Sequence, residues 1–125
     1  MITTLISAVL LIGLDFIFLT STASIYAEQI RAVQNMPLTI NYGYAIATYL
    51  IIIFALNHFI LEKDASILEA SLFGFSIYAV FELTNASLFS NWKIGTVILD
   101  TLWGGVLFGI VTGIIKLLKQ YINFM

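Results

Sequence analysis

Four long runs of apolar residues, separated by short polar stretches, form the main pattern along the chain. Each run has roughly the 20 residues that an α-helix needs to cross the hydrocarbon layer of a membrane. Because that layer offers backbone groups no hydrogen-bond partners, helices are the expected form for these runs. We therefore predict an all-α integral membrane protein with spanning helices over residues 2–27, 41–61, 65–89 and 94–118.

Much of the charge outside the runs lies in three short connections, at residues 28–37, 62–64 and 90–93. Short connections between helices place successive helices antiparallel to each other. The pattern therefore predicts a four-helix up-down-up-down bundle. The length of 125 residues is that of one domain, so we expect a single transmembrane domain over residues 1–125.

The composition also indicates a membrane protein, because 61% of the residues are hydrophobic and only 10% are charged. A soluble domain carries about 25% charged residues. A small globule leaves a large share of its surface exposed, so lipid has to cover the remaining apolar area. Five basic residues form no cluster, which argues against a nucleic-acid partner. The absence of cysteine excludes disulfides and thiolate metal sites, and we predict no cofactor.

The positions of the basic residues favour one orientation in the membrane. An even number of spans places both termini on one side, together with Lys63, Lys116 and Lys119, whereas Arg31 and Lys93 lie on the other side. Basic residues are enriched in cytoplasmic segments. We therefore predict a multi-pass protein of the cell or inner membrane with both termini in the cytoplasm.

Three acidic residues, Asp15, Glu82 and Asp100, lie inside the apolar runs. A charge at the centre of a bilayer costs at least about 2.5–3.5 kcal/mol, so such residues face the bundle interior, find partners or keep a proton. Glu82 is nine residues before Asn91 and Asp100 is nine residues after it. Since each helical residue rises by about 1.5 Å, a hairpin turning near Asn91 brings both acids to the same depth. We expect this pair to share a proton or to bind a cation.

Neighbours at helical spacing complete a hypothetical binding site. Asn85 is one turn from Glu82, and Trp103 is one turn from Asp100, with an N–H that can reach a carboxyl group. The candidate proton or cation site therefore consists of Asp15, Glu82, Asn85, Asp100 and Trp103. The alternative is structural: buried acids and amides also join helices through hydrogen bonds worth about 0.6–2 kcal/mol each.

His58, toward the end of the second run, is a possible proton relay, because imidazole changes charge near neutral pH. A single histidine at a helix end is more often interfacial. Gly105, Gly109 and Gly113 recur every four residues in the fourth run. This spacing of small residues permits close helix packing, with a partner helix in the same chain or in another subunit.

The stretch from Tyr78 to Asn85, YAVFELTN, is followed by Trp92 and then by the stretch DTLWG that begins at Asp100. Together they resemble the signature of the small membrane proteins of domain-of-unknown-function family 2177, whose first helix also carries an aspartate, as Asp15 does here. Glu82 stands where the family usually has aspartate, so the acid is kept on a longer side chain. The resemblance covers nearly the whole chain, and it implies a four-helix membrane protein but no particular activity.

Three hypotheses about function follow. The first is a proton- or cation-linked transporter or channel, in which the membrane acids form the polar site and a homo-oligomer provides the pore. The second is an accessory or structural subunit of a larger membrane protein. The third, an enzyme acting on a lipid, is weaker, because the sequence has no nucleophile motif, no glycine-rich phosphate loop and no metal cluster. Transport ranks first, so we lean against an enzyme.

Overall fold

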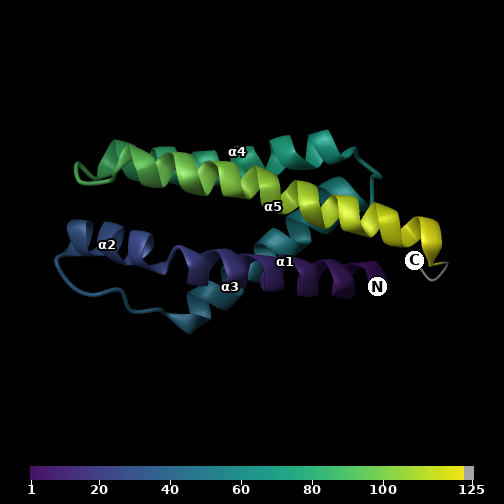
Figure 1. Ribbon diagram of the computed structural model, residues 1–125, viewed down its shortest axis with the longest axis horizontal. Helices are drawn as coiled ribbons and strands as arrows, with labels where there is room; N and C mark the ends of the chain where they lie inside the picture. Colours follow the sequence, from purple (N-terminus) through teal and green to yellow (C-terminus); the bar gives the residue numbers. More distant parts are fainter. Residues whose placement is uncertain (123–125) are drawn as a thin grey trace.

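The structure is a computed structural model that describes residues 1–122, and this part of the chain is helical without any strand (Figure 1). Its elements are α1 (Ile2–Ser21), α2 (Ala23–Gln34), α3 (Tyr42–Leu56), the π-helical turn η1 (Asn57–Leu61), α4 (Ile67–Leu88) and α5 (Ile94–Tyr121). Four helices are long and apolar enough to cross a membrane, with α3 and η1 counting as one. The predicted all-α class is confirmed.

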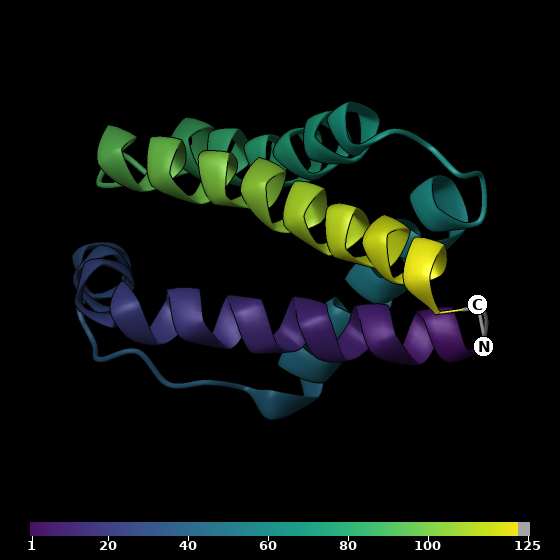
Figure 2. The same cartoon turned by 45° about the vertical axis from the view of Figure 1, so that its right-hand side comes forward.

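The start of α1 and the end of α5 lie at the same end of the molecule, and the turn between α4 and α5 lies at the opposite end (Figure 1 and Figure 2). This arrangement is compatible with the predicted up-down order of four spans. The buried core lies where α1, η1, α4 and α5 meet; its fully buried members are Leu11, Leu56, Ala70, Leu107, Phe108, Val111 and Ile115.

The first helix differs from its predicted range of 2–27. The α-helix stops at Ser21, the chain turns at Thr22, and α2 then continues to Gln34. The predicted loop over residues 28–37 is therefore wrong for residues 28–34, which belong to α2. The break has a local cause: the hydroxyl groups of Thr20, Ser21 and Thr22 donate to carbonyl groups about one turn earlier, and such bonds bend helices. A left-handed Asn35 ends α2.

The segment 35–41 runs back toward the middle of the molecule, so α3 starts part-way along it (Figure 1 and Figure 2). Asn41 begins α3 by accepting a hydrogen bond from the backbone N–H of Tyr44. At its other end, α3 widens into the π turn η1. There the buried Asn57 donates from Nδ2 to Oγ of Ser7 at 2.9 Å and ties η1 to α1.

The closest helix pair is the hairpin of α4 and α5, which approach each other at glycines. A Cβ atom on Gly74 would collide with the carbonyl oxygen of Gly104, and one on Gly104 would collide with the ring of Tyr78. Gly105 and Gly109 also face α4, where they contact Ser71. Gly113 has more room, because the nearest atom to an added Cβ is Cδ1 of Ile67 at 3.5 Å. The partner of the predicted glycine stripe is therefore α4 of the same chain.

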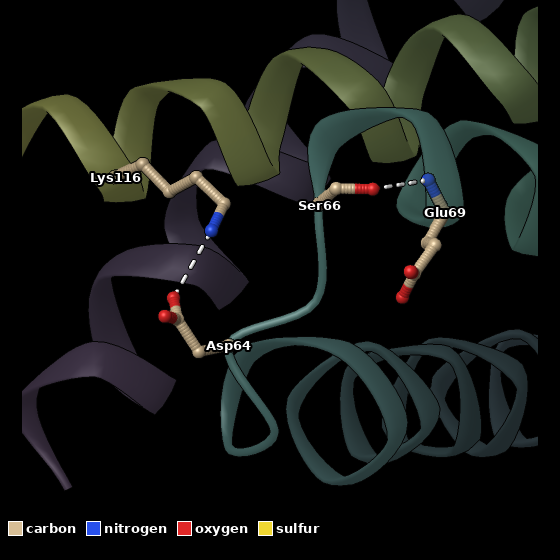
Figure 3. A network of polar contacts seen from close by, with 4 residues as sticks. All are labelled: Asp64, Ser66, Glu69 and Lys116. Atoms are coloured by element: carbon tan, nitrogen blue, oxygen red, sulfur yellow. Dashed lines mark hydrogen bonds and ion pairs between the residues drawn. The ribbon is translucent and has the colours of Figure 1, made fainter.

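Charged residues gather at the turn that leads from η1 into α4, as Figure 3 shows. Nζ of Lys116 donates to Oδ1 of Asp64 at 3.0 Å, which joins this turn to α5. Oγ of Ser66 accepts the backbone N–H of Glu69 at 3.0 Å and so caps the start of α4. The hydrogen bond and the positive charge of Lys116 hold the pKa of Asp64 below its ordinary value of 3.8.

The glycine contact predicts that Gly104→Ala weakens the fold by about 1–3 kcal/mol, because the added methyl group has no space between α4 and α5. Gly95→Ala is a matched control in the same helix, since nothing lies within 4 Å of its added Cβ. Unfolding in mixed detergent micelles, followed by circular dichroism, measures both changes. Equal stability of the two variants would contradict the close approach at Gly104.

The ion pair predicts that Asp64→Asn lowers the melting temperature slightly near neutral pH. Because the pKa of Asp64 is lowered in the folded state, its contribution is complete above 3.8 and disappears as the pH falls through the lower folded value. The difference between the variant and the parent protein should therefore vanish at the most acidic pH and at high salt. Glu62→Gln, in the same exposed turn, serves as the control. A difference independent of pH would contradict this role of the pair.

Candidate functional site

The three acids predicted to lie inside the membrane gather toward the interior of the bundle rather than on separate outer faces. Asp15 of α1 is 7% exposed, Glu82 of α4 is 1% exposed, and Asp100 of α5 is half-buried. Each acid accepts a hydrogen bond from an aromatic side chain. We call this group, with its four aromatic donors Tyr26, Tyr49, Trp92 and Trp103, the carboxyl cluster.

Asp15 is held from two sides. Trp103 of α5 donates from Nε1 to Oδ1 of Asp15 at 2.9 Å, and the hydroxyl of Tyr49 of α3 donates to Oδ2. Phe18, one turn after Asp15, stacks on Trp103 with a centroid distance of 4.4 Å and an interplanar angle of 2°. The acid therefore joins three helices through donors whose own positions are fixed by packing.

Asp100 and Glu82 accept from donors outside their own helical turns. The hydroxyl of Tyr26 in α2 donates to Oδ1 of Asp100 at 2.9 Å. Trp92, in the turn between α4 and α5, donates from Nε1 to Oε1 of Glu82 at 2.8 Å. The break at Thr22 thus has a consequence for the site, because it directs α2 and its Tyr26 onto α5.

The second oxygen of Glu82, Oε2, is buried and has no hydrogen-bond donor among residues 1–122. Asp100 lies on α5, the helix that packs against α4, and no hydrogen bond joins its side chain to that of Glu82 among the described residues. The single ion pair among the described residues joins Lys116 and Asp64, so within this part of the chain no lysine or arginine pairs with either acid. In the described residues, neither acid therefore has a neighbouring cation to balance a negative charge.

The other predicted site residues have different surroundings. Trp103 bonds to Asp15, whereas Asn85 is half-buried and its side chain forms no hydrogen bond to residues 1–122. His58 stacks on Phe54 at a centroid distance of 5.3 Å and meets Phe59 edge-on at 4.8 Å. No hydrogen bond in the described part of the chain links His58 to the carboxyl cluster. Over the same residues, no three His, Asp or Glu side chains gather to hold a metal ion.

Sequence reasoning missed four residues that organise the site through hydrogen bonds: Tyr26, Tyr49, Trp92 and Gln29. Gln29 is fully buried; its Oε1 accepts from the backbone N–H of Lys93 and from Oγ1 of Thr96, each at 2.8 Å. Its Nε2 donates to the carbonyl of Asn91 at 3.0 Å. Gln29 therefore fastens α2 to the turn next to Trp92. The stripe Asp15, Phe18, Thr22, Tyr26 and Gln29, spaced by three and four residues, was the available signal.

A cavity of about 660 Å³ lies beside the carboxyl cluster. Asp15 and Asp100 are at its inner side, and its walls come from residues 44–52 of α3 and from Ile77, Tyr78 and Phe81 of α4. Most of this wall is apolar or aromatic. The carboxyl cluster therefore borders a space of the size that small-molecule sites have.

Spanning helices and buried acids define a helical multi-pass membrane protein with a polar centre. The family model described as "Predicted membrane protein (DUF2177)" matches residues 1–117, so the chain belongs to this family. The resemblance noted from the sequence is thereby confirmed. A comparison with curated proteins found no match, and neither did a comparison with solved structures.

Proposed function

We propose that this protein is a proton-linked membrane transport protein in which Glu82 and Asp100 hold and release the transported proton. The observation that supports this proposal most strongly is the buried Oε2 of Glu82, which has no donor among residues 1–122 and belongs to the helix that packs against the one carrying Asp100. A proton bridging the two acids supplies the missing donor. Its loss leaves negative charge in a low-dielectric region, so proton release is coupled to rearrangement or to an incoming cation.

The surrounding groups favour a proton over a metal cation. Tyr26, Trp92 and Trp103 direct O–H and N–H groups at the carboxyl oxygens that a metal ion would need. Trp is a donor only, and therefore offers a metal ion no lone pair in the plane of its ring. A proton, in contrast, needs only one free oxygen lone pair on each acid.

Asp15 extends the proposed pathway toward the cavity. Tyr78 of α4 lines the cavity together with Asp15 and Asp100. The bundle of a single chain is narrow, so we propose a homo-oligomer as the transporting form. Binding to a larger membrane protein is the alternative assembly.

The proposal predicts that Glu82→Gln combined with Asp100→Asn reduces proton flux into liposomes to the level of empty vesicles, as read by an entrapped pH-sensitive dye. Glu69→Gln is the control, because it makes the same change on α4 at an exposed position near the helix start. Circular dichroism verifies that the helices are intact. Flux equal to that of the parent protein in the double variant would contradict a proton role for the pair.

Infrared spectroscopy examines the proton itself at the same time. The parent protein in lipid nanodiscs should show a carboxylic-acid C=O band at neutral pH, and this band should be missing from the double variant but present in Glu69→Gln. If the hydrogen-bonded cluster served only to pack the helices, replacing these acids would not change the proton flux.

The orientation proposed from the basic residues, with both termini in the cytoplasm, has its own test. The chain has no cysteine, so Ser90→Cys introduces a single label site in the exposed turn between α4 and α5. A membrane-impermeant maleimide added outside intact cells should label it, whereas a cysteine replacing the exposed Lys63 should stay unlabelled. The reverse pattern would place the termini outside.

A further inference from the structure

The cavity beside the carboxyl cluster is not required for holding a proton, and its chemistry indicates a ligand. We propose that it binds a lipophilic amine, with the nitrogen at Asp100 and the apolar body between α3 and α4. This inference deepens the proposed function, on which it rests, by naming the class of substrate that exchanges with the proton.

The position of the cavity favours a ligand that enters from the lipid. Tyr44 and Ile51 of α3 and Phe81 of α4, which line the cavity, are also exposed on the outer surface of the bundle, by 77%, 67% and 57%. These residues belong to membrane-spanning helices, so this surface faces hydrocarbon. A ligand that reaches the cavity by this route must dissolve in the bilayer.

The charged groups at the inner side determine the sign of the head group. Asp15 and Asp100 are the ionisable acids of the cavity wall, and no lysine or arginine lines it. An anionic lipid head group would meet two carboxyl groups. A protonated amine finds an acceptor in Asp100, and the rings of Tyr44, Tyr49 and Phe81 attract a cation through their π faces.

The volume of about 660 Å³ matches one small ligand with an alkyl or aryl body. Ile52 and Ile77 provide apolar contact on the two facing helices. The ligand enters as a neutral amine, because only this form crosses hydrocarbon readily. An O–H bond of the Glu82–Asp100 pair then breaks as the nitrogen lone pair forms an N–H bond, which leaves an ammonium ion beside a carboxylate.

The test uses dodecylamine and the full-length protein in phosphatidylcholine nanodiscs, with empty nanodiscs as the calorimetric blank. We expect saturable binding to the parent protein and an affinity at least about tenfold lower for Asp100→Asn, since a charge-assisted hydrogen bond is lost. Dodecanol should bind at least about tenfold more weakly than the amine, and dodecyl sulfate should not bind.

A second pair of variants distinguishes the contribution of the cavity to amine binding from that of the charge. Ala47→Trp fills the cavity without removing an acid, and it should abolish amine binding. Ala86→Trp places the same side chain on an exposed part of α4 outside the cavity, and it should bind as the parent protein does. Equal affinity for all three dodecyl compounds, or amine binding that survives Ala47→Trp, would overturn the inference.

The infrared measurement keeps this inference distinct from the proposed function. If the carboxylic-acid band is present but the amine does not bind, the ligand inference is wrong while the proton site stands. If the amine binds but the parent protein lacks that band, both the proton transfer and the proposed function are wrong. Loss of the band on amine binding is the expected result.

Discussion

The burial of carboxyl groups inside a bundle surrounded by lipid is the constraint on which the rest of the structure depends. Each of the three acids would be costly alone in hydrocarbon. The protein offsets this cost with O–H and N–H groups on large aromatic rings, which come from helices other than the acid's own in the cases of Tyr26, Tyr49 and Trp103. The same hydrogen bonds that solvate the acids therefore also fix the positions of α2 and α3, which pack less closely on the bundle than α4 does on α5.

The division between a close hairpin and more loosely attached helices explains where a cavity can exist. Glycines let α4 and α5 approach closely, and no space is left for an added side chain at Gly74 or Gly104. On the opposite side of the acids, α3 begins only part-way along the molecule (Figure 1). Side chains of α3 and α4 there line the cavity. A close-packed pair thus carries Glu82 and Asp100, while the more open side gives the cavity access to Asp100 and Asp15. Rigid support beside an accessible space is what a site for proton exchange requires.

The sequence predicted the four spans and the acids inside them because both can be read from the positions of apolar and acidic residues. Apolar length identifies a membrane helix, and equal distances from the turn at Asn91 place Glu82 and Asp100 at one depth. The break at Thr22 was not predicted, because Thr20, Ser21 and Thr22 are counted as part of the apolar run, and hydroxyl residues also occur in unbroken helices. Treating Gln29 as a loop residue then concealed its buried contacts. The donor Tyr49 depends on how α3 leans against α1, which helical periodicity in one segment cannot determine.

The π turn at Asn57–Leu61 has a consequence for the attachment of the second span. A π turn accommodates one more residue than the α-helical turn it replaces. The extra residue is absorbed within the turn, so the helix before it keeps its direction while the turn is wider than an α-helical one. Asn57 bonds Ser7 of α1 from this turn, and Asp64 pairs with Lys116 of α5 directly after it. The wider turn thus lies where the end of the second span is attached to two other helices.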